Sequence, residues 1–578
     1  MSSLPRCARV GISTHRQISS GPSNLDSAKM HVKNMVLTQW KLINGLKFYL
    51  LKLTNDKTLE NALNTEFAQF LQKINFKIPK KEMLQYFASD KDKDKDDSSK
   101  APPADAKDKK GQSIQSRLQN IPGMFSSLNI GMKTAEEKKK ESMPNWKCAP
   151  KPVISKESIA SRTCQVITSI KLAESDHLKM KRIEDLVAHL ERYPLAKHHA
   201  VKDGAIRALL RIREGTKEPN IQGSANLALA LLGHTDIVPG AGLRILSIDG
   251  GGTRGILVIE MLKKLEEFTK KPVHEMFDFI CGVSTGAILA CLIGLKHKTL
   301  DEVSDIYKNI STQIFTQSAL AGTSNLVWSH SYYDTALWEK LLKDQWQDQI
   351  LIHTRKDPRT PKFCAVSAVV NHSRLTAYVF RNYSLPVKVQ SQYCGNYNHY
   401  VWEAIRASAA APTYFEECKI DNMLHQDGGI LVNNPTAVAI HEARLLWPRA
   451  PIQCVISFGT GRTAPNPMMG IDGYTCSSWK TKFLAILDSA TDTEGVHTML
   501  SDLLPTNVYF RFNPYLTEML NIAEIHPQKL EQLKRDALMY LRRNEDKFQN
   551  AAEALSRKKG IGQKGVDWIS KKREMYGF

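Results

Sequence analysis

The segment 282–286, with the sequence Gly-Val-Ser-Thr-Gly, constrains this fold more than any other part of the chain. An apolar run typical of a strand, 276–281, precedes it, and an apolar run that suits a buried helix, 287–293, follows it. A strand, a sharp turn and a helix form the context in which a G-x-S-x-G elbow presents a nucleophilic serine. The pattern predicts that Ser284 is a nucleophile; the alternative is a structural tight turn.

A glycine-rich loop lies one β-α-β unit upstream of this elbow. An apolar strand at 243–249 runs into the loop 250–255, and a helix with one apolar face follows it. A right-handed crossover places the carboxyl ends of two parallel strands at the same edge of a sheet. We therefore expect the loop amides beside the Ser284 hydroxyl, where successive N–H groups would stabilise an oxyanion. Arg254 would help hold an anion there, or it is an ordinary surface arginine.

The same loop also fits the dinucleotide fingerprint G-x-G-x-x-G, at Gly250, Gly252 and Gly255. A nucleotide-binding module is therefore an alternative of a different class. The next strand argues against it, because that strand leads into a serine elbow and not to a ribose-binding carboxylate. The loop is also no P-loop, since no Gly-Lys-Ser/Thr follows.

A candidate base for the serine follows a short strand at 422–426. Asp427 stands at the end of that strand, and Gly428 and Gly429 allow a close approach of the backbone. A free carboxylate with a pKa of ~3.9 is a poor base, but burial beside an apolar acyl chain would raise that pKa. Taken alone, an Asp-Gly pair is more often a surface turn.

These three motifs, in this order, resemble those of the patatin-like phospholipases. The stretches 406–415 and 455–461 and the sequence Asn433-Asn434-Pro435 are also similar to that family. The resemblance covers residues 243–461 and implies an α/β fold, a three-layer α/β/α hydrolase domain. The helical region before this domain and the linker-rich N-terminal half are most like those of the gamma-type, calcium-independent members.

The resemblance implies a Ser-Asp dyad, with Ser284 as nucleophile and Asp427 as base. It assigns the oxyanion hole to the amides of Gly251, Gly252 and Thr253. The motif residues that would support this site are Gly250, Arg254, Gly255, Gly282, Gly286, Gly428 and Gly429. A triad would instead need a histidine after the aspartate, for which His441 and His497 are the candidates.

The activity that the resemblance implies is hydrolysis of the fatty acyl esters of membrane glycerophospholipids, of A1 or A2 type. Free fatty acid and lysophospholipid would be the products. The alternatives are a lysophospholipase or transacylase, a triacylglycerol lipase, and a non-catalytic scaffold. We expect no metal or cofactor, because the sequence has no calcium loop of the D-x-[DN]-x-[DN]-G type.

Composition limits the partners of this chain. Its 578 residues hold 79 Lys and Arg against 59 Asp and Glu, a net charge of +20. Such a surface suits an anionic partner, which the family resemblance makes an anionic bilayer surface; no nucleic acid is expected. The ten cysteines form no C-x-x-C pair, which favours a reducing compartment. No apolar run reaches the ~20 residues that a spanning helix needs.

The N-terminal part has three segments. Residues 1–35 are typical of a mitochondrial targeting segment, with arginines, serines and no acid before Asp26; the alternative is a disordered basic terminus. Residues 36–88 show helical apolar spacing without an assignable role. The segment 89–150 contains a run of alternating Lys and Asp and predicts a disordered linker.

Two helical parts flank the catalytic domain. Residues 155–236 predict four helices and look like one or two armadillo-type repeats, which would cap the next domain or contact a partner protein. The extension 462–578 is expected to be mostly helical and basic, and its segment 548–578 would suit a membrane surface. We expect an intracellular, membrane-associated protein, with the mitochondrion favoured and the endoplasmic reticulum second. A peroxisomal location is doubtful because the sequence does not end in Ser-Lys-Leu.

Overall fold

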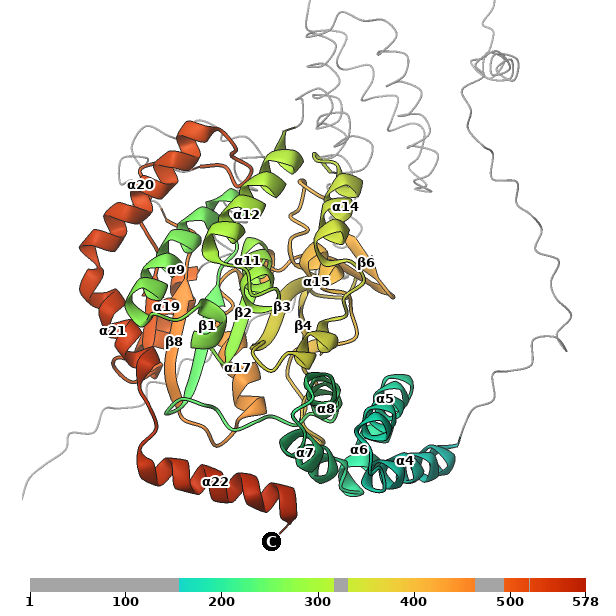
Figure 1. Ribbon diagram of the computed structural model, residues 1–578. Coiled ribbons are helices and arrows are strands. Elements are labelled where there is room, and N and C mark those ends of the chain that lie inside the picture. Colours follow the sequence, from blue (N-terminus) through green and yellow to red (C-terminus); the bar gives the residue numbers. More distant parts are fainter. Residues whose placement is uncertain (1–154, 317–330, 463–492, 519, 578) are drawn as a thin grey trace, which may run out of the picture. The chain divides into compact units, whose positions relative to one another are not determined.

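The computed structural model describes residues 155–316, 331–462, 493–518 and 520–577 (Figure 1). The predicted targeting segment 1–35, the helical segment 36–88 and the linker 89–150 lie outside these residues. Within them, no helix combines the length and apolarity that crossing a bilayer requires.

A mixed nine-stranded β-sheet forms the centre of the described chain. Its main path runs β5-β4-β3-β2-β1-β8-β9, with β7 pairing both β3 and β6. The strands β1, β2, β3, β8 and β9 are mutually parallel, whereas β4 and β7 run antiparallel to β3. The strand bounds are β1 Leu243–Ile248, β2 Phe279–Val283, β3 Lys362–Val369, β4 Thr376–Arg381, β5 Cys394–Asn396, β6 Cys418–Ile420, β7 Met423–Asp427, β8 Ile452–Phe458 and β9 Tyr509–Phe512.

Helices cover both faces of this sheet, so its central strands are buried on both sides. In β1, Leu243 and Ile245 belong to one core cluster and Leu246 and Ile248 to the other. Apolar side chains toward both faces of one strand are typical of parallel strands between two helical layers. The first face carries α9 Gly255–Thr269, α11 Thr285–Gly294 and α12 Leu300–Phe315, and the second carries α17 Thr436–Leu446. The predicted α/β class with three layers is confirmed.

The unit β1-α9-β2 sets the position of the candidate site. Ile248, the last residue of β1, pairs with Gly282 near the end of β2, so the two strands end at one edge. The loop after β1 contains the short helix η2 Gly252–Arg254 and leads directly into α9. Further helices of the domain are α14 Thr335–Trp346, η3 Leu351–Lys356, α15 Val401–Ser408 and α16 Gly429–Val432.

The strand before the elbow begins later than the sequence indicates. We expected it at 276–281, but β2 is Phe279–Val283 and the single-turn helix α10 Val273–Met276 comes first. Pro272 at the start of that turn favours a helix. Asp278 then accepts the backbone N–H of Arg244 at 3.0 Å and pairs with its guanidinium at 2.7 Å. This ion pair holds the chain immediately before the strand.

Five helices, not the expected four, form the region before the sheet. They are α4 Lys156–Lys171, α5 Asp176–Arg192, α6 Ala196–Lys202, α7 Ala205–Gly215 and α8 Pro219–Leu231. The extra helix α6 follows Pro194 and ends before Gly204, whose φ of 84° favours glycine. Ile352 of η3 belongs to the same core cluster as these helices, which joins them to the domain that contains the sheet. Their likeness to armadillo repeats stays a prediction.

The C-terminal part contributes to the sheet as well as to its helical cover. β9 pairs with β8 in parallel, so the sheet continues past residue 461, where the sequence placed the end of the catalytic domain. The helices are α19 Thr493–Leu503, α20 Pro527–Arg543, α21 Glu545–Ser556 and α22 Ile561–Tyr576. Leu533 of α20 and Phe548 of α21 are buried in the core that includes α9. The last helix, α22, reaches α7, where Arg211 donates to the carbonyl of Met575 at 2.9 Å.

A buried ion pair between β4 and α17 provides a test of this packing. Arg381 donates to both oxygens of Glu442, at 2.7 and 2.8 Å, and the Tyr383 hydroxyl donates to the same carboxylate at 2.7 Å. We expect Glu442→Ala to lower the free energy of unfolding by ~3–5 kcal/mol, because a buried guanidinium loses its partner. Chemical denaturation measures this change. The control Glu518→Ala breaks an exposed pair with Lys529 and is expected to cost at most ~1 kcal/mol; equal losses in both variants would refute the prediction.

Candidate active site

Ser284 stands in the tight turn between β2 and α11. Its φ of 53° and ψ of −123° are unusual for a residue with a side chain, and such strain is concentrated at functional sites. A Cβ at Gly286 would collide with the carbonyl of Ile248, and one at Gly282 would collide with the backbone of Gly286. The glycines of the motif therefore allow the backbone approach that holds Ser284 at the N-terminus of α11.

The hydroxyl of Ser284 meets the carboxylate of Asp427. Ser284 Oγ donates to Asp427 Oδ2 at 2.5 Å, and the N–H of Gly429 donates to Asp427 Oδ1 at 2.7 Å. Asp427 is the last residue of β7, and its own N–H donates to the carbonyl of Ala410 at 2.9 Å. The two residues predicted as nucleophile and base are thus within hydrogen-bond reach of one another.

The environment of Asp427 changes its acidity in the direction that a base requires. The side chain is buried, and this burial raises its pKa from the ordinary value near 3.8 to about 6, although the hydrogen bonds from Ser284 and Gly429 act to lower the pKa. At neutral pH the carboxylate is still ionised. It is also a stronger proton acceptor than a carboxylate in water.

The glycine loop lies directly beside the nucleophile. A Cβ at Gly250 would come within 3.1 Å of the Ser284 Cβ and 2.6 Å of Asn433 Oδ1. The carbonyl of Gly250 accepts the hydroxyl of Thr460 at 2.6 Å. Gly252, with a φ of 56°, accepts the Thr285 hydroxyl on its carbonyl at 2.9 Å and also bonds the hydroxyl of Tyr307. These bonds fix the loop against the start of α11.

The three predicted oxyanion donors differ in availability. In the described part of the chain, no hydrogen bond has the N–H of Gly251 or Gly252 as its donor. The N–H of Thr253, in contrast, donates to the carbonyl of Ile522 at 2.8 Å. The structure therefore leaves the amides of Gly251 and Gly252 open to a ligand and engages that of Thr253. Arg254 donates from Nε to the carbonyl of Gly251 at 3.1 Å and so helps to close the loop.

Two further side chains support the site and were not predicted as site residues. Ser408 Oγ accepts the N–H of Ser284 at 2.9 Å and donates to the carbonyl of Val366 at 2.6 Å. The sequence assigned no role to Asn433. Its Oδ1 lies so close to the loop and to the turn after Asp427 that a Cβ at Gly250 or at Gly429 would come within 2.6 or 3.1 Å of it. Both belong to stretches that carry the family resemblance, and that was the only signal pointing to them.

Neither histidine that a triad would use contacts the dyad. His441 lies on α17, where its Nε2 accepts the N–H of Gln392 at 3.3 Å. His497 lies on α19, where its Nδ1 is 3.2 Å from Ser501 Oγ. The arrangement therefore supports a site in which the carboxylate bonds the serine directly.

The geometry of the loop also argues against a dinucleotide-binding site. Ser284 occupies the end of β2, where such a fold would place its ribose-binding carboxylate. The loop also bonds the first residue of α11 through the Thr285 hydroxyl, so it faces the nucleophile. Within the described ranges, no group of three or more His, Cys, Asp or Glu side chains is placed to hold a metal ion.

Comparison with known proteins gives one family. Residues 246–440 match the family of patatin-like phospholipases. The chain is 44% identical over 463 residues to a protein of Oryctolagus cuniculus named calcium-independent phospholipase A2-gamma, which covers 80% of this chain and 58% of the relative. The Homo sapiens protein of that name is 43% identical with the same coverage. Phospholipase A I of Arabidopsis thaliana is 32% identical to this chain over 416 residues. The match covers 61% of this chain and 31% of that relative. This chain thus spans less than two thirds of the length of these relatives.

The raised pKa of Asp427 predicts how the free energy of unfolding depends on pH. Because the pKa of Asp427 is about 6 in the folded chain and ~3.9 in the unfolded one, ionising it costs folding free energy as pH rises through this window. We expect Asp427→Asn to be more stable than the wild type above pH ~6, by on the order of 2–3 kcal/mol, and this advantage to vanish below pH ~4. Denaturation across this pH range measures the difference.

The matched control is Asp421→Asn, in the exposed turn between β6 and β7. Its stability relative to the wild type should not change with pH by a comparable amount. An Asp427→Asn protein with the same free energy of unfolding as the wild type at every pH would refute the raised pKa of this buried carboxylate.

Proposed function

We propose that this chain, whose residues 246–440 belong to the patatin-like phospholipase family, hydrolyses the fatty acyl esters of membrane glycerophospholipids through Ser284 and Asp427. The observation that carries the proposal is the 2.5 Å hydrogen bond from Ser284 Oγ to Asp427 Oδ2, beside the open amides of the glycine loop. A nucleophile, its base and a place for the oxyanion are the three parts that acyl transfer requires.

The first half of the reaction forms an acyl-enzyme. Asp427 accepts the proton of the Ser284 hydroxyl as Oγ attacks the ester carbonyl carbon. The negative charge that develops on the carbonyl oxygen is stabilised by the N–H groups of Gly251 and Gly252. The tetrahedral intermediate then collapses, the carbon–oxygen bond to the glycerol breaks, and the lysophospholipid leaves with the proton held by Asp427.

The second half releases the fatty acid. A water molecule replaces the departed alcohol, and Asp427 accepts its proton as the water oxygen attacks the acyl-enzyme carbonyl. The same two amides stabilise the second oxyanion. When the intermediate collapses, Ser284 Oγ recovers a proton from Asp427 and free fatty acid leaves. The dyad completes the cycle with no histidine and no metal ion in any step.

The substrate class rests on the relatives and on charge. The relatives matched over most of this chain are named phospholipases A2 and are described as calcium-independent. The net charge of +20 supports action at an anionic bilayer surface. The composition of residues 1–35 favours a mitochondrial membrane. A lysophospholipase or transacylase would use the same dyad and differs only in the acceptor or donor of the acyl chain.

Product analysis tests the assignment of the nucleophile. Wild-type protein is given a phospholipid with different acyl chains at its two ester positions, and the released acids are measured by mass spectrometry. We expect Ser284→Ala to release no acid above the uncatalysed rate, and Asp427→Asn to lose at least ~10³-fold in kcat, as removal of a dyad member does. A Ser284→Ala protein with the wild-type rate would exclude this mechanism.

The two candidate histidines supply matched controls in the same assay. His441→Ala and His497→Ala should retain kcat within about threefold, because neither side chain contacts the dyad. A loss as large as that of Asp427→Asn in either variant would replace the dyad with a triad.

The pKa of Asp427 predicts the pH dependence of the reaction. Only the ionised carboxylate accepts a proton, so kcat/KM should rise with pH and level off above a midpoint near 6. A soluble short-chain ester is the appropriate substrate, because it avoids titration of a lipid surface. A midpoint near 4, the value of a carboxylate in water, would contradict the effect of burial on this base.

A further inference from the structure

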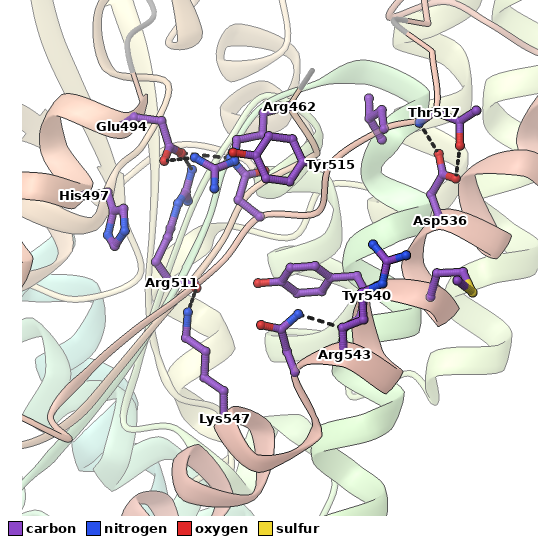
Figure 2. Close-up of a pocket in the computed structure, with 14 residues that line it drawn as sticks. Arg462, Glu494, His497, Arg511, Tyr515, Thr517, Asp536, Tyr540, Arg543 and Lys547 are labelled. Carbon is purple, nitrogen blue, oxygen red and sulfur yellow. Dashed lines mark hydrogen bonds and ion pairs between the residues drawn. The ribbon is translucent and has the colours of Figure 1, made fainter. Parts of the chain in front are cut away.

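A second cavity of about 530 Å³ lies between β9 and the helices α19, α20 and α21 (Figure 2). Neither Ser284 nor Asp427 lines it, so it is separate from the dyad. Its size is within the ~300–1,000 Å³ typical of small-molecule sites. The residues around it, however, are unusually rich in positive charge.

Four cationic side chains line this cavity: Arg462, Arg511, Arg543 and Lys547. Figure 2 shows Arg511 and Lys547 approaching from one side and Arg543 with Tyr540 from another. Arg511 pairs with Asp249 at 2.6 Å, and Arg462 pairs with Glu494 at 2.8 Å. Among the described residues, no carboxylate lies within ion-pair distance of Arg543 or Lys547.

The acidic side chains of the lining are already engaged. Glu494 accepts Arg462 and also the side-chain amide of Asn513 at 2.9 Å. Asp536 accepts the N–H and the hydroxyl of Thr517, at 2.9 and 2.6 Å. Among the described residues, these carboxylates therefore form no ion pair with Lys547 or Arg543.

Arg511, the most buried of these cations, has an N–H donor that no acceptor in the described chain engages. Arg511 is only 3% exposed, and within the described chain its Nε has no acceptor. The Nε of Arg462 is buried and without an acceptor as well. A buried donor without an acceptor costs ~1–3 kcal/mol, and an anion would remove this cost.

The position of Lys547 also favours an anion in this cavity. Its Nζ donates to the carbonyl of Arg511 at 2.6 Å, which keeps the ammonium close to that residue's side of the cavity. Burial lowers the pKa of Lys547, the nearby Arg462 and Arg511 lower it further, and Glu494 opposes this shift in part. An anion bound between these groups would reverse that effect by offsetting the repulsion among three cations.

The remaining wall is apolar and aromatic. Tyr515 stacks under the guanidinium of Arg462, whose carbon lies 4.3 Å from the ring centroid. Leu516, Met539 and Tyr540 continue this wall, and Tyr515 and Met539 are exposed at its margin. A ligand that fills the cavity therefore combines an anionic group with an organic part.

We propose that this cavity binds an organic phosphate ester, with its phosphate among the four cationic side chains of the lining and its organic part against Tyr515 and Met539. Guanidinium groups match the geometry of phosphate oxygens, and lysine adds a point charge. A lipid head group and a soluble phosphate ester share this chemistry, and the experiment separates the two sources. Because Arg511 also holds Asp249, the residue before Gly250, the cavity adjoins the base of the glycine loop but not the nucleophile.

The test compares two double variants of the full chain in a Ser284→Ala background, which prevents hydrolysis. Arg543→Gln with Lys547→Gln removes the two cations of the lining that have no carboxylate at ion-pair distance among the described residues. Arg542→Gln with Lys558→Gln removes the same charge from exposed residues outside the cavity. Binding is measured by calorimetry with phenyl phosphate, and by sedimentation with phosphatidylcholine vesicles with and without phosphatidic acid.

We expect the cavity variant to bind at least one probe ~10-fold more weakly than the control variant, the loss of about one charged hydrogen bond. Weakening with phenyl phosphate identifies a soluble ester, and weakening confined to phosphatidic acid vesicles identifies a lipid head group. Equal binding of both probes by the two double variants would overturn the proposal. Arg543→Gln alone, at an exposed position, gives a folded variant in which a smaller loss must appear.

Discussion

The candidate site depends on the pairing of β3 with two different neighbours. β3 runs parallel to β2, which delivers Ser284, and antiparallel to β7, which ends at Asp427. The carbonyl of Val366 in β3 accepts the hydroxyl of Ser408, and that hydroxyl in turn accepts the N–H of Ser284. A Cβ at Gly428 would collide with the same carbonyl. One strand therefore fixes the positions of Ser284, Asp427 and Ser408.

This arrangement holds two groups in unfavourable states. Ser284 has a strained backbone, and Asp427 is ionised although it is buried. Both costs are tolerated because the strands around them are buried on two faces by apolar side chains. Burial also keeps the pKa of Asp427 above the value that a carboxylate has in water, as its proposed role as a base requires. The burial that makes ionised Asp427 costly for stability is thus also what raises its pKa.

Positive charge is used in two ways around the glycine loop. At Ser284, the proposed oxyanion hole uses the partial charges of backbone amides and no cationic side chain. Behind the loop, Arg511 pairs with Asp249 and also lines the cavity between β9 and α19, α20 and α21. The glycine loop is therefore linked, through Asp249 and Arg511, to a cavity lined by cationic side chains.

The sequence alone determined the fold class, the elbow and the glycine loop, and the family resemblance of its motifs paired Ser284 with Asp427. These features are local patterns: periodicity, glycines where no Cβ fits, and motifs whose order matches a family. Helix boundaries were less well determined, because α6 and α10 are short and their apolar spacing is weak.

Only the tertiary structure decided which backbone donors are open and which distant residues meet. The N–H of Thr253 is engaged by Ile522, over two hundred residues later in the chain, and no local pattern records that contact. The same is true of β9, which joins the sheet from beyond the family motifs, and of the second cavity, whose walls come from four separate segments. Such pairings depend on packing between remote elements, whereas a sequence motif encodes only the conformation and chemistry of its own segment.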